Sequence, residues 1–235
     1  MYSVSRISES IYSITDQEQI MVRMYLIVGE QNAVLLDSGL GGAGLPEVLH
    51  GITDRPIAVY HTHGDGDHVG GDAFFHEAFI SPCEYSYYRK WNPALNGVKL
   101  SALWEGSIIH AAPYHFRVIS TPGHTPGSLS FWEEEKGLLF PGDSLCAGVI
   151  VMTGDDRDLE AYRASIEDQY LPIFDKVTAV YPCHDEACLD RMIIKDCRQA
   201  VSRTNQPVTL LDDTYPQFLH GKRALTYHKV AVVID

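Results

Sequence analysis

The sequence predicts a mixed α and β fold in which two β-sheets pack against each other and helices cover them. Short apolar runs rich in β-branched and aromatic residues recur in both halves of the chain. Segments with helical spacing of apolar residues separate these runs. The 235 residues, 45% of them hydrophobic, are enough to bury a sizeable core. Sheets and helices of this kind bury their apolar faces by stacking in layers.

The first half of the chain alternates between predicted strands and short helices. Strands are expected at residues 10–14, 21–28, 33–37, 56–60 and 78–80, and helices at residues 45–51 and 84–91. Glycines at residues 39–42 end the third strand, and a short helix is expected after residue 71. The irregular stretch at residues 92–106 is typical of a binding loop or lid. The aromatic residues of the helix at 84–91 are expected to pack rather than to bind a substrate.

The second half continues the pattern. Strands are expected at residues 107–110, 114–119, 128–132, 137–140, 177–181 and 225–234, and helices at residues 158–171 and 188–203. Residues 154–158 are expected to form a solvated loop that caps the helix after it, and the alternative is that they line the cleft of the site. No internal repeat or low-complexity linker divides the chain.

Composition limits the classes of partner and compartment. Acidic residues outnumber basic ones by 31 to 18, and the net charge of −13 argues against binding to nucleic acid or to an anionic membrane. The N-terminus lacks the apolar stretch of a signal peptide, and no apolar run is long enough for a membrane span. The five cysteines form no CxxC pair and are expected to be reduced thiols in a cytoplasmic protein.

One stretch combines histidines and carboxylates at unusual density. Residues 62–71 read THGDGDHVGG and follow the predicted strand at 56–60. His63, Asp65, Asp67 and His68 are residue types that Zn²⁺, Fe²⁺ and Mn²⁺ accept as ligands. If the segment stays extended, the first three side chains share one side. The alternative is a polar turn that caps a helix near Asp72.

Three more polar residues follow predicted strands in the same way. They are His124, Asp143 and His184. Strand ends in a layered fold meet at one edge, where binding sites are usually built. Each residue alone could be a turn or a cap, but four such positions in succession predict a shared site.

These motifs resemble those of the metallo-β-lactamase superfamily. The stretch at residues 62–71 is similar to its Thr-His-x-His-x-Asp-His-x-Gly-Gly signature, and residues 121–128, TPGHTPGS, match its second motif at every position. Residues 140–143, 182–184 and 36–39 resemble three further motifs. The resemblance runs from about residue 8 to residue 190. It implies a single domain over residues 1–235, a four-layer αββα sandwich and two metal ions at one edge.

The resemblance also implies a role for each ligand. His63 and His124 would hold the first metal, Asp67 and His68 with His184 would hold the second, and Asp143 would bridge them. Asp65 stands where the family usually has a second histidine. Related flavodiiron proteins carry a glutamate there, so Asp65 remains a candidate ligand.

Two consequences of Asp65 are expected. The carboxylate adds a negative charge beside the first metal and makes a bound water less acidic. It also makes iron or manganese an alternative to zinc. A second alignment of the sequence with the family motif would use His61 and His63 as the histidine pair. This second register would need two extra residues before Asp67. His61 is then expected to point outward or to lie behind the ligands.

The expected activity is metal-dependent hydrolysis. The resemblance implies a hydroxide between two metals, oriented by Asp67 and attacking a small thioester, ester or lactone. The alternative is a diiron-type oxidoreductase that reduces O₂ or NO or oxidises a persulfide. Activity as a β-lactamase or phosphodiesterase, or a non-catalytic metal-stabilised binding module, are further alternatives. A monomer and a homodimer both remain open, since dimers are common.

Overall fold

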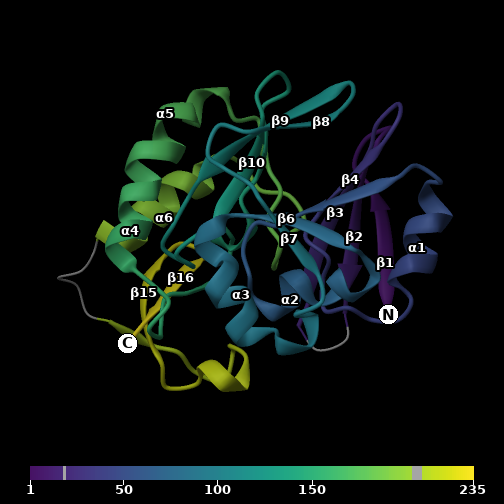
Figure 1. Ribbon diagram of the computed structural model, residues 1–235. Coiled ribbons are helices and arrows are strands. Elements are labelled where there is room, and N and C mark those ends of the chain that lie inside the picture. The colour runs from purple at the N-terminus through teal and green to yellow at the C-terminus, as the bar shows by residue number, and fades with distance from the viewer. Residues whose placement is uncertain (18–19, 203–207) are drawn as a thin grey trace.

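Strands in three sheets organise the computed structural model, which describes residues 1–17, 20–202 and 208–235 (Figure 1). The first sheet contains seven strands in sequence order. They are β1 (Tyr2–Arg6), β2 (Ile11–Asp16), β3 (Val22–Val28), β4 (Ala33–Leu36), β5 (Ile57–Tyr60), β6 (Glu77–Ile80) and β7 (Lys99–Ala102). Pairing is antiparallel from β1 to β4 and parallel from β4 to β7.

The second sheet has the strand order β13-β11-β10-β9-β8. Its strands are β8 (Ile108–Ala111), β9 (Tyr114–Ser120), β10 (Leu129–Glu133), β11 (Leu138–Phe140) and β13 (Ala179–Val180). A smaller sheet in the order β12-β16-β15-β14 lies beside it. That sheet contains β12 (Val149–Val151), β14 (Thr209–Leu210), β15 (Arg223–Tyr227) and β16 (Val230–Ile234).

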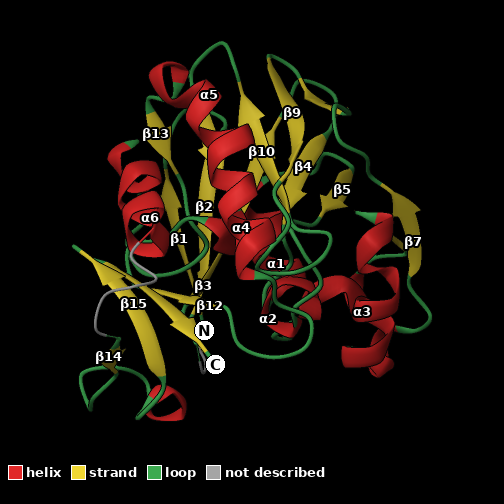
Figure 2. Ribbon diagram, turned by 90° about the vertical axis from the view of Figure 1, so that its left-hand side faces the viewer, coloured by secondary structure: helices red, strands yellow, loops and turns green. Residues whose placement is uncertain are grey.

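Helices cover the outer faces of the two larger sheets, and Figure 2 is viewed onto the face that the later helices cover. On the first sheet they are α1 (Leu45–Ile52), α2 (Gly66–Val69) and α3 (Tyr85–Trp91). On the second they are α4 (Leu159–Ser165), a π-helical turn (Ile166–Tyr170), α5 (Leu171–Ile173) and α6 (Met192–Ser202). Helix α6 also packs against β15 and β16 of the smaller sheet. Short 3₁₀ turns lie at Gly70–Phe74, Pro82–Glu84, Pro93–Leu95, Gly142–Ser144, Phe174–Lys176 and Gln217–Leu219.

Side-chain alternation explains why the first sheet is buried on both faces. In β3, Tyr25 and Ile27 face the second sheet, whereas Met24 and Leu26 face α1. The ring of Tyr25 meets that of Phe140 edge-on, with centroids 5.0 Å apart, in the core between the sheets. The layers therefore run helix, sheet, sheet, helix, and the predicted αββα sandwich is confirmed.

Several boundaries differ from the expectation. The predicted single strand at residues 225–234 is wrong: β15 and β16 form a hairpin that reverses at His228, which has a positive φ of 49°. The irregular stretch at 92–106 contains β7, which adds to the edge of the first sheet. Helix α6 begins at Met192, later than the predicted residue 188, and residue 203 lies outside the described residues.

In the part of the chain that the structure describes, none of the helices has both the length and the apolar character needed to cross a membrane.

Candidate metal centre

The predicted ligands lie at one edge of the two larger sheets. They follow the carboxyl ends of β5, β9, β11 and β13, and the turn at residues 37–39 follows β4. β4 and β5 are parallel, as are β11 and β13, and β9 runs parallel to β11 because both are antiparallel to β10. Carboxyl ends of like-directed strands meet at one edge, so the topology brings distant residues together.

The first motif is not extended throughout. Asp65 is extended, with φ −66° and ψ 146°, but helix α2 begins at Gly66. The predicted alternation of His63, Asp65 and Asp67 along a strand is therefore wrong. The helical turn that begins at Gly66 carries Asp67 and His68, whose ligand atoms lie within 4.8 Å of each other. Behind it, a Cβ on Gly71 would lie 2.3 Å from the Ser38 carbonyl oxygen, so only glycine fits this approach.

Six of the seven predicted ligands form two groups, in each of which the ligand atoms lie within 4.8 Å of one another. The first group is His63, His124 and Asp143, and the second is Asp67, His68 and His184. Oδ2 of Asp143 lies 3.5 Å from Nε2 of His124. Oδ1 of Asp143 lies 3.2 Å from Nε2 of His68 and 3.3 Å from Nε2 of His184. Asp143 thus faces both groups, which is the geometry expected of a bridging residue.

Each of the four histidines is oriented by an acceptor at Nδ1. The acceptors are Thr62 Oγ1 for His63 (3.0 Å), Asp37 Oδ2 for His68 (2.9 Å), the Val151 carbonyl for His124 (3.0 Å) and the Met21 carbonyl for His184 (2.7 Å). A carbonyl oxygen only accepts, so Nδ1 of His124 and of His184 carries the hydrogen. The Nε2 atoms are then left to face the site, as in metal-binding histidines.

Buried atoms at the site have no hydrogen-bond partner. Among the described residues, Nε2 of His63, Nε2 of His68 and Oδ1 of Asp143 are buried without a hydrogen bond, although Nε2 of His68 and Oδ1 of Asp143 lie 3.2 Å apart as an ion pair. Leaving such atoms unsatisfied costs about 1–3 kcal/mol each. A cation between them would satisfy all three, since each offers a lone pair. The donor set therefore fits a metal site.

Electrostatics at the site couple the carboxylates to the imidazoles. Burial alone would raise the pKa of Asp143, but His184 and His68 lower it well below its usual range. Burial alone would lower the pKa of His184, but Asp143 and Asp67 raise it to about 10. Burial lowers the pKa of His124, which favours the neutral ring that a metal requires.

Asp37 supports the second group from behind. Its Oδ1 accepts from the Thr62 backbone N–H at 2.8 Å, and its Oδ2 accepts from the Thr62 hydroxyl and from His68. His61, expected to point outward or to lie behind the ligands, is fully buried behind them and bonds Asp72 at 2.8 Å. Burial alone would lower the pKa of His61, but Asp72 and Asp37 raise it to about 9. The second register, with His61 as a ligand, is therefore wrong.

Three supporting residues escaped the sequence reasoning. The buried carboxylate of Glu84 accepts from the backbone N–H of Gly64 at 2.8 Å and of Gly127 at 2.6 Å. It thereby ties the loop of His63 to the loop of His124. Arg157, predicted to lie in a solvated loop, donates to Asp65 at 2.7 Å, and Tyr87, predicted only to pack, also hydrogen-bonds Asp65. No motif in the sequence connects these positions.

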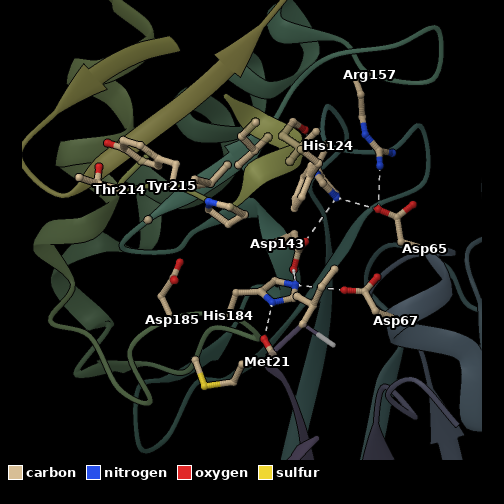
Figure 3. Close-up of a pocket in the computed structure, with 17 residues that line it drawn as sticks. Met21, Asp65, Asp67, His124, Asp143, Arg157, His184, Asp185, Thr214 and Tyr215 are labelled. Atoms are coloured by element: carbon tan, nitrogen blue, oxygen red, sulfur yellow. Dashed lines mark hydrogen bonds and ion pairs between the residues drawn. The ribbon is translucent and has the colours of Figure 1, made fainter. Parts of the chain in front are cut away.

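A cavity of about 750 Å³ opens at the site (Figure 3). Asp65, Asp67, His124, Asp143 and His184 form its polar side. The opposite side is largely apolar and comes from Ile20 and Met21, from β12, and from the segment at residues 214–219. A polar centre facing an apolar wall is typical of small-molecule sites.

Comparison with known proteins identifies the family and several relatives. The sequence model of the metallo-beta-lactamase superfamily matches residues 19–184. Hydroxyacylglutathione hydrolase GloC of Haemophilus influenzae is 28% identical over 173 residues, covering 64% of this chain and 79% of that protein. Acyl-coenzyme A thioesterase MBLAC2 of Gallus gallus is 25% identical over 165 residues, covering 54% and 59%.

Solved structures share the fold. A metallo-beta-lactamase from Pontibacter korlensis superimposes with a TM-score of 0.75 at 17% identity, covering 87% of this chain and all of that chain (100%). At this identity the likeness concerns the fold alone. Because the family match spans residues 19–184, which is most of the sequence, the chain belongs to the metallo-beta-lactamase superfamily.

Proposed function

We propose that this protein is a hydrolase that holds two divalent metal ions, zinc foremost, and cleaves a small thioester, ester or lactone. The observation that carries the proposal is the pair of donor groups that both face Asp143, with Nε2 of His63, Nε2 of His68 and Oδ1 of Asp143 buried without a hydrogen bond. The names of the two relatives, a hydroxyacylglutathione hydrolase and an acyl-coenzyme A thioesterase, support hydrolysis of an acyl compound.

Each residue of the site has a proposed role in holding metal or in activating water. His63, His124 and Asp65 would hold the first ion, Asp67, His68 and His184 the second, and Asp143 both. Metal ions there would supply Lewis acidity to a substrate carbonyl and lower the pKa of water. Asp67 lies at the mouth of the cavity, with its side chain 20% exposed and Oδ2 at 3.4 Å from Nε2 of His184. Its carboxylate would orient the attacking water and accept its proton.

The apolar wall supports a substrate with an apolar part. Tyr215, Phe218 and Leu219 line the cavity opposite the polar centre. These three residues lie C-terminal to residues 19–184, so the family match does not include this wall of the cavity. An acyl group packed on this wall would direct the reacting carbonyl toward Asp143 and the two donor groups.

A diiron oxidoreductase is the second candidate, because Asp65 adds a carboxylate of the kind that suits iron. The contact between Asp65 and Arg157 offsets the added negative charge and removes much of that preference. We therefore favour the hydrolase.

Metal analysis combined with a substrate panel tests the proposal. Protein purified without added metal is expected to contain two zinc ions per chain. It should hydrolyse members of a thioester, ester and lactone panel, lose this activity with a chelator and regain it with zinc. His184→Ala should lower the metal content, whereas His228→Ala, in an exposed hairpin turn that pairs with Asp196, should not. Iron that bleaches on reduction, or a fully zinc-loaded protein inactive on the whole panel, would overturn the proposal.

A further inference from the structure

We propose that Asp65 and Arg157 act as one neutral unit that replaces the second histidine of the first donor group, with Arg157 as a positioning residue that sets metal affinity there. This inference rests on the metal site of the proposed function. It goes beyond that site because Arg157 comes from a loop before α4 that belongs to none of the motifs.

The contact is direct and enclosed. Nη2 of Arg157 lies 2.7 Å from Oδ2 of Asp65, and the two side chains are only 11% and 18% exposed. The same oxygen lies 3.2 Å from Nε2 of His124 and 3.4 Å from Nε2 of His63. The atom of Asp65 that faces the two imidazoles is thus the atom that accepts from the guanidinium. Ion pairs this far from solvent are weakly screened by salt.

Neighbouring contacts fix the geometry of the pair. The Tyr87 hydroxyl donates to the other oxygen, Oδ1 of Asp65, so both carboxylate oxygens have partners. The Arg157 guanidinium lies over the Tyr87 ring, 5.6 Å from its centroid. Asp156 anchors the same loop to α3, since its Oδ2 accepts at 3.3 Å from both Lys90 Nζ and Trp91 Nε1.

The net charge of the pair explains why Asp65 and Arg157 together can replace a histidine. A neutral imidazole contributes no net charge, and an aspartate with an arginine sums to zero. Asp65 alone would make three carboxylates at the site with Asp67 and Asp143. With Arg157 included, the net charge of these side chains returns to that of two carboxylates. The expectation that Asp65 leaves extra negative charge on the first metal is therefore corrected by the contact with Arg157.

The consequence is that neither residue can be exchanged alone. In Asp65→His, the Arg157 guanidinium would remain buried beside a divalent ion with no counter-charge, which is strongly unfavourable. Zinc affinity is expected to fall about 10- to 100-fold, the range seen when groups that support metal ligands are lost. Adding Arg157→Gln removes the stranded charge, so the double variant should bind zinc within a few-fold of the wild type.

The test is a double-mutant cycle on zinc affinity, measured by competition with a chromogenic chelator. The variants are Asp65→His, Arg157→Gln and their combination. Arg223→Gln, on an exposed residue of β15 that donates to the Asp235 carbonyl, replaces Arg157→Gln in a matched control. Rescue of Asp65→His by Arg157→Gln and not by Arg223→Gln supports the proposal. If Asp65→His does not fold, Asp65→Asn with and without Arg157→Gln tests the same coupling.

Two outcomes would overturn it. Additive effects at positions 65 and 157, in a wild-type protein that binds two zinc ions, would reject the paired unit and leave the proposed function standing. A wild-type protein that binds no divalent metal would reject both.

Discussion

Asp37 illustrates how a single residue behind the site can control it. Its two oxygens accept from four donors, of which the Cys183 thiol at 3.5 Å is the most distant. Although burial alone would raise its pKa, His68 and His61 lower it well below its usual range. The carboxylate is therefore ionised and holds Nδ1 of His68. This leaves Nε2 of His68 directed at Asp143.

Asp37→Asn is expected to weaken binding of zinc to the second donor group about 10- to 100-fold. The amide keeps the shape of the side chain but turns an N–H toward groups that are all donors. Chelator competition measures the effect. Asp54→Asn, at an exposed position just after α1, is the control and should bind zinc like the wild type. Unchanged affinity in Asp37→Asn would show that Asp37 does not orient His68.

The cysteines offer a second prediction at the residue scale. All five are free, with Cys83 and Cys188 exposed and the other three buried. Burial raises the pKa of Cys197 to about 12, as it does that of Cys183, so these thiols are protonated at neutral pH. Iodoacetamide at pH 8 should label two sites per native chain and five after denaturation, counted by mass spectrometry. Rapid labelling of Cys197 in the native protein would contradict the described burial.

At the scale of elements, the sequence predicted those strands whose residues show a local apolar pattern. Apolar alternation identified β2, β3, β4 and β9 with small errors at their ends. β1 was missed because it is a short, mostly exposed strand at the edge of the sheet, with only Tyr2 and Val4 as alternating apolar residues. The hairpin at β15 and β16 was read as one strand because no glycine or proline marks the turn at His228 and Lys229.

In the site, too, residues that lie in local motifs were predicted, and residues that depend on long-range contacts were not. The ligands were predicted because motifs carry them, and the fold then brings their strand ends together. Arg157 was not predicted, because its contact with Asp65 joins positions 92 residues apart in sequence. Glu84 was missed for a similar reason, since its partners are backbone groups in two other loops. Contacts of this kind depend on the packing of elements, which local spacing does not encode.

Gly123 shows how an element constrains the site. It has φ +135°, and a Cβ there would lie 2.5 Å from backbone atoms of Tyr162 in α4. Its carbonyl also accepts from the Asp158 N–H, so α4 begins directly against the turn that carries His124. Gly123→Ala should lower the free energy of unfolding by at least about 2 kcal/mol, from backbone strain and overpacking. Urea denaturation measures the loss.

The matched control for Gly123→Ala is Gly51→Ala. Gly51 lies in α1, and no atom would lie within 4 Å of its Cβ. Alanine is favoured over glycine in helices, so this change should be neutral or stabilise the protein by up to about 1 kcal/mol. Equal effects of the two changes would indicate that the contact between the turn and α4 is not tight.

At the scale of the whole molecule, the candidate metal centre joins the two larger sheets. Its ligands follow β5 in the first sheet and β9, β11 and β13 in the second. Ions bound there would link both sheets, and binding to the folded state alone stabilises it by mass action. At free zinc 1,000-fold above the dissociation constant the gain is about 4 kcal/mol. Chelation should therefore lower the melting temperature by several degrees, as measured by calorimetry with and without added zinc.

This stabilisation should grow with pH. In chelated protein Asp143 and Asp67 raise the pKa of His184 to about 10, against an ordinary unfolded value near 6.5. Protonated His184 then stabilises the chelated fold fully below pH 6.5, and this contribution is lost as the pH rises toward 10. Zinc needs the neutral ring, so the zinc-loaded fold does not depend on that proton. The gap in melting temperature between loaded and chelated protein should widen from pH 6 to pH 8.5.

His184→Gln separates this effect from general changes of charge with pH. The variant has no titrating ring between Asp67 and Asp143, so its chelated form should lose less stability over the same range. His228→Gln removes an exposed histidine whose ion-pair partner is Asp196. In this variant the gap in melting temperature should widen with pH as it does in the wild type. A gap that stays constant with pH in the wild type would mean that His184 is already neutral in chelated protein. The coupling between Asp143 and His184 would then be weaker than their 3.3 Å separation implies.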